Sequence, residues 1–234
     1  MAVQTYKAKI EKIIQETPYS KTFTLDLGKD IEFLPGQFVM IEFANKLPGV
    51  RRAYSISSPP SLKKTITITL KKEGAFTTAL DESLVGEEIL VKGPMGLFTL
   101  DASQKKDIVF IAGGTGIAPF RSMIHYLLDN KMPNKMTVFY STKNPEEFIF
   151  FRELNELQAM HPQLTVVFTA TRCTEPTWNG FCERVSAEMI ARTVANCKEC
   201  IYYLCGPLKM VQDIETTLLQ MGIDKKNIKA ERWG

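Results

Sequence analysis

Three short motifs contain the residue types that could do chemistry in this chain. The first is a glycine turn at residues 113–116 (Gly-Gly-Thr-Gly), which follows the apolar run 108–112 and precedes Pro119. Glycines let the backbone approach a pyrophosphate closely, and a helix starting there offers unpaired N–H groups and a favourable dipole. The turn lacks the full G-x-G-x-x-G spacing, so by itself it also fits a tight turn without a ligand.

The other two motifs are Arg51-Arg52-Ala53-Tyr54-Ser55 and Cys205-Gly206-Pro207 with Met210. Arg52 can make paired, charge-assisted hydrogen bonds to phosphates, and Tyr54 has a flat face that can stack on a planar cofactor. The same strand could instead carry a surface arginine and a core tyrosine. Cys205 could pack beside a cofactor ring or be a buried structural cysteine.

The hydrophobic pattern of the sequence changes near residue 101, which divides the chain into two halves that must position these motifs. From Thr5 to about Leu100, apolar residues alternate with polar ones, as in 65–70, and turn residues such as 92–94 (Lys-Gly-Pro) separate the runs. This alternation predicts short, half-buried antiparallel strands. We therefore expect a β-barrel or sandwich in residues 1–101, interrupted by one or two helical turns at 76–84.

After a polar linker at 101–106, strands alternate with helical patterns of roughly 10–15 residues, which is typical of parallel βαβ units. We expect a Rossmann-like parallel α/β domain in residues 105–234. Its expected strands are 107–112, 136–141, 164–170, 200–205 and 227–231. Its expected helices are 118–130, 146–160, 183–192 and 207–221.

Composition limits the function classes. The 234 residues are 44% hydrophobic and 24% charged, as expected for a soluble protein with a core, and the net charge of +3 is too small for a nucleic-acid-binding face. No apolar stretch approaches the roughly 20 residues of a membrane span, and residues 1–10 lack a secretory signal. Five cysteines predict reduced thiols in a cytoplasmic protein. Cys197-x-x-Cys200 is half of a metal-ligand pattern, so we expect no metal.

In their order along the chain, with Arg51-Arg52-Ala53-Tyr54-Ser55 first, the glycine turn second and Cys205-Gly206-Pro207 third, the motifs resemble those of the ferredoxin–NADP reductase superfamily. Its compact form includes flavodoxin reductases, cytochrome b5 reductases and reductase components of bacterial oxygenases. The resemblance covers essentially the whole chain. It implies a flavin-binding antiparallel β-barrel in residues 1–101 and an NAD(P)-binding parallel α/β domain in residues 105–234, sharing a cleft.

The resemblance also implies how the barrel holds FAD, with FMN as an alternative. Arg52 would bind the flavin phosphates, Tyr54 would stack on the ring system, and the Ser55 hydroxyl would lie near flavin N5. Backbone amides from Gly74 to Thr77 would hold the diphosphate, with Thr77 supplying a hydroxyl. The expected flavin-binding residues are Arg52, Ala53, Tyr54, Ser55, Ile68, Thr69, Leu70, Gly74, Ala75, Phe76, Thr77 and Trp233.

The second half is expected to bind the nicotinamide dinucleotide. The expected residues are Gly114, Thr115 and Gly116 at the pyrophosphate, Thr171 and Arg172 at the adenosine, and Cys205, Gly206 and Pro207 at the nicotinamide. Thr171-Arg172 is similar to the pair that meets the 2′-phosphate in NADP-preferring relatives, and Lys143 could add charge, so we expect NADPH. Three acidic residues close in sequence favour NADH instead: Glu146, Glu147 and Glu175.

Glu231 and Trp233 lie near the end of the sequence. Plant-type relatives end similarly, with a glutamate near the catalytic centre and a terminal tyrosine over the flavin. The resemblance implies that Glu231 orients groups near N5 and that Trp233 covers the isoalloxazine until hydride transfer. This chain has Trp and ends in Gly234, so a tail docked on the core is the alternative. The expected catalytic residues are Ser55, Cys205 and Glu231.

The implied activity is hydride transfer from NADPH or NADH to bound FAD, followed by electron delivery to a separate redox protein. We expect no fused iron–sulfur domain, so a ferredoxin, a flavodoxin or an oxygenase component would be the acceptor. Two alternatives are a free-flavin reductase and a flavin-binding relay subunit of a larger redox complex. Relay subunits of that kind usually carry a C-terminal cysteine cluster, which this sequence lacks after Cys205.

Overall fold

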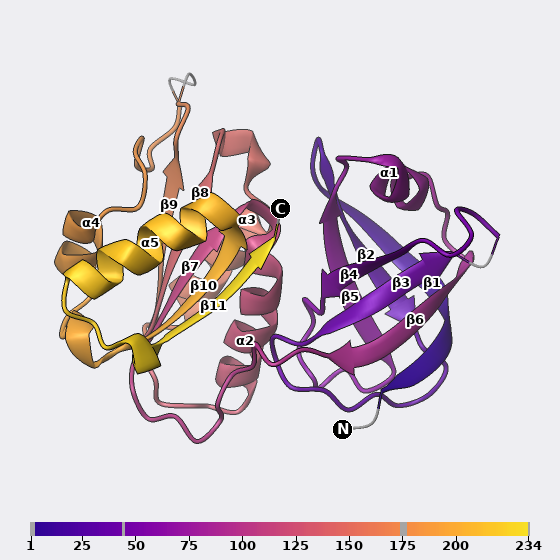
Figure 1. Ribbon diagram of the computed structural model, residues 1–234, viewed down its shortest axis with the longest axis horizontal. Helices are drawn as coiled ribbons and strands as arrows, with labels where there is room; N and C mark the ends of the chain where they lie inside the picture. Colours follow the sequence, from indigo (N-terminus) through magenta and orange to yellow (C-terminus); the bar gives the residue numbers. More distant parts are fainter. Residues whose placement is uncertain (1–2, 44, 174–176, 234) are drawn as a thin grey trace. The chain divides into compact units, whose positions relative to one another are not determined.

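The computed structural model describes residues 3–43, 45–173 and 177–233 (Figure 1). The chain divides into two compact units, one of Met1–Asp101 with Ala118–Asn130 and one of Ala102–Ile117 with Lys131–Gly234. Helix α2 (Ile117–Asp129) is therefore grouped with the first unit although it follows the first strand of the second. A boundary drawn along the sequence cannot represent that grouping.

The first unit is a six-stranded antiparallel sheet in the order β4-β3-β6-β1-β2-β5. Its strands are β1 (Gln4–Thr17), β2 (Ser20–Asp26), β3 (Phe38–Phe43), β4 (Arg51–Ser55), β5 (Thr65–Lys71) and β6 (Glu88–Met95). The two ends of this order meet, because Ile56 bridges to Ile68 and the Ser57 N–H donates to the Thr67 carbonyl at 2.8 Å. The sheet therefore closes into a barrel, and the expected period-two pattern is confirmed by the alternating burial along β3.

Two helices pack on this barrel. Helix α1 (Ala75–Asp81) buries Phe76 and Leu80 in the barrel core. Helix α2 is held by the Ser122 hydroxyl, which donates to the Ser58 carbonyl at 2.6 Å, and by Arg121, which donates to the Ser57 carbonyl at 2.9 Å. These bonds satisfy carbonyls just beyond β4, so α2 and the end of β4 are fixed together.

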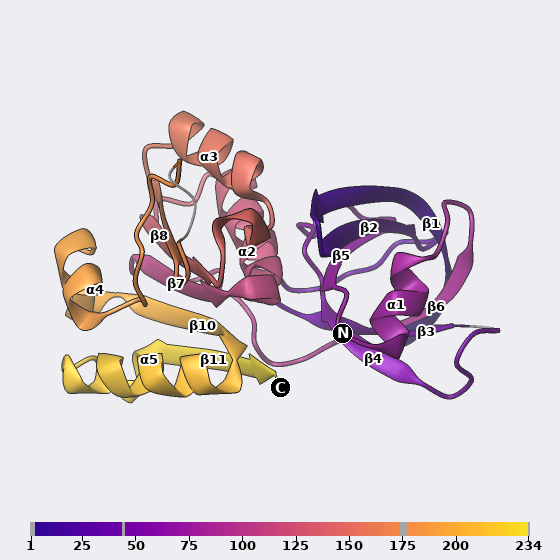
Figure 2. The same ribbon diagram turned by 90° about the horizontal axis from the view of Figure 1, so that it is seen from above.

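The second unit is a five-stranded parallel sheet in the order β11-β10-β7-β8-β9. Its strands are β7 (Ile108–Gly113), β8 (Met136–Thr142), β9 (Leu164–Ala170), β10 (Ile201–Pro207) and β11 (Ile228–Trp233). Helices α4 (Ala187–Thr193) and α5 (Leu208–Gln220) lie on one face, and α3 (Phe151–Met160) lies on the other (Figure 2). The predicted barrel followed by a parallel α/β sheet is therefore confirmed.

Strand order in this sheet reverses direction between β7 and β10, because the chain first runs outward through β8 and β9 and then returns to β10. Loops on the two sides of such a reversal diverge at the carboxyl ends of the strands, which leaves a crevice where ligands of open α/β sheets bind. The glycine turn follows β7, and the Cys205-Gly206-Pro207 motif ends β10. Both motifs therefore lie at the reversal point.

The helix expected over 146–160 is wrong in its first part. Residues Pro145–Glu147 form a single 3-10 turn, and α3 begins only at Phe151. Phe148, Ile149 and Phe150 between them are buried, and Phe150 has a left-handed φ of 59°. An apolar run that must be buried on all sides cannot continue as an amphipathic helix, so tertiary packing overrides the helical pattern. Similarly, the helix expected from 183 begins at Ala187.

The prediction that all five cysteines are reduced thiols is also wrong. Cys173 and Cys182 form a disulfide, whereas Cys197, Cys200 and Cys205 are free. Phe181 exchanges backbone hydrogen bonds with the edge of β9, and this pairing brings Cys182 to a Cα–Cα distance of 5.8 Å from Cys173. The two Cα atoms come this close only because of that strand pairing, which the number of cysteines in the sequence does not predict.

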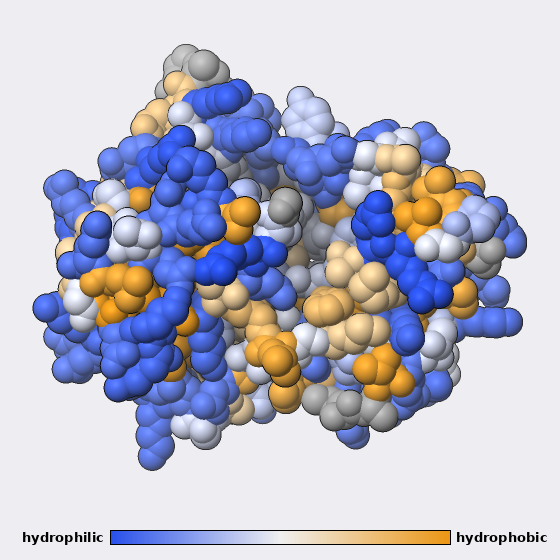
Figure 3. Space-filling view, in the orientation of Figure 1, coloured by the Kyte–Doolittle hydropathy of each residue, from blue (hydrophilic) through white to orange (hydrophobic). Residues whose placement is uncertain are grey.

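Hydrophilic side chains dominate the face shown in Figure 3, and apolar side chains occur there in scattered groups. None of the helices within the described residues combines the length and the apolar character that crossing a bilayer would require.

Candidate functional site

In the first unit, two sequence segments predicted to bind flavin form one surface. Arg52 and Tyr54 lie two residues apart on β4 and so share a face of the strand. The Tyr54 ring stacks on Phe76 of α1 with a centroid distance of 6.3 Å, and the Arg52 guanidinium lies 6.0 Å from the Phe76 ring centroid. The exposed Arg52 therefore extends beside the start of α1, where the diphosphate amides were predicted.

Tyr54 provides a neutral hydroxyl at this surface. The side chain is half-buried, and burial raises the pKa of Tyr54 to about 12, although the neighbouring Arg52 charge lowers it. The phenol therefore stays protonated at neutral pH and can donate a hydrogen bond. A cation, an aromatic face and a hydroxyl donor lie together, which suits a ligand with a planar ring and a phosphate.

The first turn of α1 is open to a ligand, and the Thr77 hydroxyl is engaged within the helix start, so its predicted role at the diphosphate stays a prediction. This hydroxyl accepts hydrogen bonds from the Glu73 and Gly74 N–H groups, both at 2.9 Å, and so caps the helix. The next three N–H groups, of residues 75–77, precede the first helical hydrogen bond, which the Thr78 N–H donates to the Gly74 carbonyl at 2.8 Å. No acidic side chain lies in this turn, and no atom lies within 4 Å of the place that a Gly74 Cβ would take. This open turn beside Arg52 fits a flavin diphosphate.

The side chains of the β5 segment are not available to a ligand. Ile68 and Leu70 belong to the barrel core, and the buried Thr69 hydroxyl bonds with those of Thr22 at 2.9 Å and Ser57 at 3.2 Å. Of residues 68–70, only the backbone could contact a flavin, and their predicted role stays a prediction. On β4, Ala53 is exposed and the half-buried Ser55 pairs with Phe38 of β3.

The glycines at the reversal point of the second sheet serve two purposes. A Cβ at Gly116 would overlap the Cys205 carbonyl oxygen and would lie 2.5 Å from the Trp233 ring, and one at Gly113 would lie 2.5 Å from the Met210 sulfur. These two glycines are therefore required by packing within the unit. Their presence alone carries no information about a ligand.

Gly114 is different, and it provides the fit to a dinucleotide. It has a left-handed φ of 54°, and no atom lies within 4 Å of the place that its Cβ would take. Gly114 is also the first residue of the 3-10 turn Gly114–Gly116, which leads into α2. Open space above a glycine at the start of a helix is what a pyrophosphate bound by backbone amides requires.

Cys205 and Glu231 are direct neighbours in the parallel sheet. They are register partners on β10 and β11, and the Cys205 sulfur lies 3.9 Å from the Glu231 carboxylate. Burial raises the pKa of the fully enclosed Cys205 thiol well above its usual range, and the negative charge of Glu231 adds to this shift. Burial also raises the pKa of Glu231, against the effect of its hydrogen bond with Cys205. Both groups therefore bind their protons more tightly than the same side chains do in water.

Trp233 packs on the glycine turn, since its ring is next to the position of a Gly116 Cβ, and the side chain remains 36% exposed. This contact agrees with the alternative of a tail docked on its own unit. The predicted cover over the isoalloxazine stays a prediction. Because Cys205 and Gly206 are buried, Pro207 is the exposed residue of the nicotinamide motif.

Two cationic residues, Lys143 and Arg172, lie side by side just after the carboxyl ends of β8 and β9. The Arg172 N–H donates to the Lys143 carbonyl at 2.7 Å, and the Thr171 N–H donates to the Thr142 carbonyl at 3.1 Å. Both Arg172 and Lys143 are exposed. Of the acidic residues considered against NADPH, Glu147 accepts a hydrogen bond from Asn144 at 2.6 Å, whereas Glu175 lies outside the described residues.

An aromatic cavity of the second unit was missed by sequence reasoning. It has a volume of about 380 Å³ beside the edge of β9. Its lining includes Phe151, Phe168, Trp178 and Phe181. Trp178 stacks on Phe148 with a centroid distance of 5.2 Å and an interplanar angle of 17°. Trp178 and Phe181, which lie between two cysteines in the sequence, were the available sequence signal for this cavity.

Comparison with known proteins agrees with both halves of the site. The family described as "Oxidoreductase FAD-binding domain" matches residues 7–100, and the one described as "Oxidoreductase NAD-binding domain" matches residues 110–216. The chain belongs to the ferredoxin–NADP reductase superfamily and contains its FAD-binding and NAD-binding oxidoreductase domains. FAD and a nicotinamide dinucleotide are accordingly its cofactor and co-substrate.

Individual relatives come from several redox systems. The chain is 30% identical to the reductase component of phenol 2-monooxygenase from Pseudomonas sp. strain CF600, over 99% of this chain and 66% of the relative. It is 28% identical to the sulfhydrogenase 1 gamma subunit of Pyrococcus furiosus, over 95% and 77%. A solved structure of the ferredoxin reductase in carbazole 1,9a-dioxygenase superposes with a TM-score of 0.89 at 24% identity, covering 100% of this chain and 70% of the other. This likeness shows the fold.

The chain spans between 64% and 66% of the length of the first three curated relatives it matches.

Proposed function

We propose that this protein is an NAD(P)H-dependent flavoprotein oxidoreductase that passes electrons to a separate redox protein. The observation that carries the proposal is a pair of open backbone surfaces in one chain, at the first turn of α1 beside Arg52 and at Gly114. Each lies at a glycine whose Cβ position is free of other parts of the chain within 4 Å, and backbone N–H groups at such a turn suit a phosphate. One surface for a flavin and one for a dinucleotide is the minimum that such a reductase requires.

When bound, FAD accepts a hydride from the reduced nicotinamide and can release the electrons singly, which is chemistry that no side chain supplies. The chain's own residues bind and orient. Arg52 and Tyr54 would hold the flavin, and Ser55 would donate a hydrogen bond near its N5. Cys205 and Glu231, whose side chains lie 3.9 Å apart, would pack beside the nicotinamide and orient groups near N5, respectively. These three catalytic assignments stay predictions.

NADPH is the proposed electron donor. The exposed Arg172 and Lys143 support this preference. Because the Arg172 N–H donates a hydrogen bond to the Lys143 carbonyl at 2.7 Å, the guanidinium and ammonium side chains extend from neighbouring backbone positions. A 2′-phosphate carries charge that a pair of cations stabilises, whereas a 2′-hydroxyl gains little from them. NADH remains the alternative co-substrate.

The proposed acceptor is a separate ferredoxin, flavodoxin or oxygenase component, and the proposed location is the cytoplasm. Support for the acceptor comes from the phenol 2-monooxygenase relative, whose name describes a reductase component. The likeness to a sulfhydrogenase gamma subunit, with 77% of that protein covered, favours a second candidate: a flavin-binding relay subunit of a larger redox complex.

An anaerobic visible spectrum before and after one equivalent of NADPH, repeated with NADH, tests the proposal. We expect flavin bands near one flavin per chain that bleach faster with NADPH, and Arg172→Ala should remove the difference between the two donors. Equal bleaching with NADH would keep the reductase and reject the phosphate site. A colourless protein that neither FAD nor FMN reconstitutes would overturn the proposed activity. Loss of bleaching in the isolated chain despite bound flavin would favour the relay subunit.

A further inference from the structure

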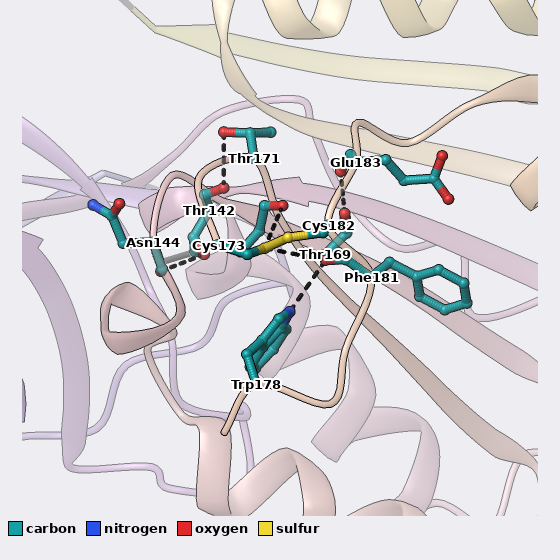
Figure 4. The surroundings of a disulfide bond; sticks show 10 residues. Thr142, Asn144, Thr169, Thr171, Cys173, Trp178, Phe181, Cys182 and Glu183 are labelled. Carbon is teal, nitrogen blue, oxygen red and sulfur yellow. Dashed lines mark hydrogen bonds between the residues drawn. A yellow bond between two sulfur atoms is a disulfide. The ribbon is translucent and has the colours of Figure 1, made fainter. Parts of the chain in front are cut away.

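The Cys173–Cys182 disulfide joins two segments that lie at the edge of the second sheet (Figure 4). Cys173 directly follows Arg172, and Cys182 directly follows Phe181, whose N–H donates to the Phe168 carbonyl at 3.1 Å and whose carbonyl accepts from the Ala170 N–H at 2.9 Å. The bond therefore ties the residue after the proposed 2′-phosphate contact to a segment that is paired with β9.

The Cys182 end of the bond is also anchored to the core of the unit. The Trp178 indole N–H donates to the Phe181 carbonyl at 3.2 Å, and its ring stacks on Phe148. Figure 4 shows Trp178 directed toward this carbonyl from below the disulfide. With Phe181 fixed by both β9 and Trp178, the disulfide is the covalent connection through which that fixed segment restrains the backbone at Arg172.

The disulfide is accessible and both of its redox states are accommodated. Cys182 is exposed, so a thiolate can reach its sulfur, whereas Cys173 is half-buried. The Cys173 sulfur lies 3.3 Å from the Ala170 carbonyl oxygen, so after reduction the thiol proton has an acceptor in place. Cytosolic disulfides are mostly transient and redox-sensing rather than structural.

We propose that Cys173 and Cys182 form a redox-active site, reduced by small or protein dithiols, whose oxidised state strengthens nicotinamide dinucleotide binding by holding Arg172 in place. This inference rests on the proposed function, because it concerns the affinity of the same dinucleotide site. Oxidation removes conformational freedom from the Arg172 backbone before the ligand arrives. Less ordering is then required on binding.

A dithiol reductant supplies the two electrons and two protons that reduction of the Cys173–Cys182 disulfide requires. One thiolate of the dithiol attacks the exposed Cys182 sulfur, the S–S bond breaks, and Cys173 leaves as a thiolate that takes a proton. The second thiol of the reductant then attacks the mixed disulfide and releases Cys182. Two electrons pass to the protein and the dithiol becomes a disulfide. Oxidation runs the same steps in reverse with a disulfide as the oxidant.

The first measurement is a thiol count in the full chain. Protein purified in air and unfolded without reductant should alkylate at three of its five cysteines, Cys197, Cys200 and Cys205, whereas reduced protein should alkylate at all five. Five reactive thiols in the air-oxidised protein would overturn the proposal before any ligand is added.

The second measurement is the dissociation constant of NADP⁺ by calorimetry, with the protein oxidised and then reduced with dithiothreitol that is removed anaerobically. We expect reduction to weaken binding by about fivefold or more, the lower end of usual coupling between sites, with a smaller effect on NAD⁺. The double variant C173S/C182S should match reduced protein in both buffers. Cys197→Ser, which keeps the disulfide, should respond as the unmodified protein does.

Reciprocity gives a third readout that does not require a variant to fold. NADP⁺ must stabilise the disulfide by the same factor by which the disulfide strengthens NADP⁺ binding. A tenfold effect would lower the midpoint potential of the pair by about 30 mV in a dithiol–disulfide buffer. Equal or tighter NADP⁺ binding after reduction, with an unmoved midpoint, would reject the coupling and leave the reductase intact. No NADP⁺ binding in either state would reject the proposed function and the coupling together.

Discussion

Arg51 and Arg52 are adjacent in sequence, yet the structure gives them different surroundings. Arg51 pairs with Glu42 at 2.6 Å, whereas the Arg52 guanidinium lies over Phe76 at the start of α1. Adjacent residues of a strand point to opposite faces, so only one of the two can serve a ligand at α1. The fit to a flavin phosphate therefore depends on one arginine of the pair.

Arg52→Ala should weaken FAD binding roughly tenfold to a hundredfold, because hydrogen bonds to charged groups contribute about 1.5–3 kcal/mol. The fold should be unaffected, since Arg52 is exposed. FAD titration of the apoprotein measures the change. Arg51→Ala is the matched control and should retain the original affinity. Equal FAD binding by both variants would remove Arg52 from the flavin site.

The raised pKa of Glu231, beside Cys205, should make the free energy of unfolding fall as the pH rises. Burial raises the folded-state pKa of Glu231, so between its unfolded and folded pKa values the native protein holds a proton that the unfolded chain has lost. Stability therefore falls as pH rises through that window, which begins near 4.5, and is level above it. The Cys205 thiol is protonated throughout, because its own pKa is raised above 9.

Glu231→Gln replaces the carboxyl with a neutral group and should abolish this fall. We expect the stability of the variant relative to the unmodified protein to increase between pH 4.5 and the folded pKa and then to stay constant. Urea unfolding at a series of pH values measures it, with the exposed Glu188→Gln on α4 as control. A difference that does not vary with pH would contradict the raised pKa.

At the scale of elements, the contact between the glycine turn and the end of β10 determines the packing of the second unit. Gly116→Ala would place a Cβ against the Cys205 carbonyl and the Trp233 ring, and overpacking of this kind usually costs about 1–3 kcal/mol. Thermal or urea unfolding should show this loss. Gly74→Ala, where the added Cβ meets nothing within 4 Å, should cost less stability but should weaken FAD binding.

The attachment of α2 to the barrel gives a second prediction at this scale. Ser122→Ala removes the 2.6 Å hydrogen bond to the buried Ser58 carbonyl, and a buried acceptor left without its donor costs about 1–3 kcal/mol. Ser61→Ala is a matched control, because its hydrogen bond to Asp129 is exposed. Urea unfolding should separate the two variants. Equal stability would mean that water replaces the Ser122 donor.

For the whole molecule, each cofactor should stabilise the unit that contains its residues. A ligand at a hundred times its dissociation constant stabilises the native state by about 2.7 kcal/mol. Amide hydrogen exchange should therefore slow on FAD addition in β4 and α1, and on NADP⁺ addition at residues 113–116 and 171–172. FAD protection confined to the second unit would contradict the assignment of the two sites.

Local sequence patterns determined much of this protein. Period-two alternation fixed the β character of the first half, because a strand with one buried face needs it, and all five strands of the second half lie within two residues of their expected bounds. The three motifs also identified the family and its two cofactors. These properties are carried by residues that are near one another in the chain.

Only the tertiary structure decided which of those residues meet. The reversal between β7 and β10 placed Cys205 against Gly116. Packing of Phe148 against Tyr140 and Phe168 delayed the start of the expected helix to Phe151, and pairing of Phe181 with β9 closed the disulfide. It also showed that Gly113 and Gly116 serve packing while Gly114 is left open. Strand order and side-chain packing join residues far apart in sequence, and the free energy of those contacts is absent from any local pattern.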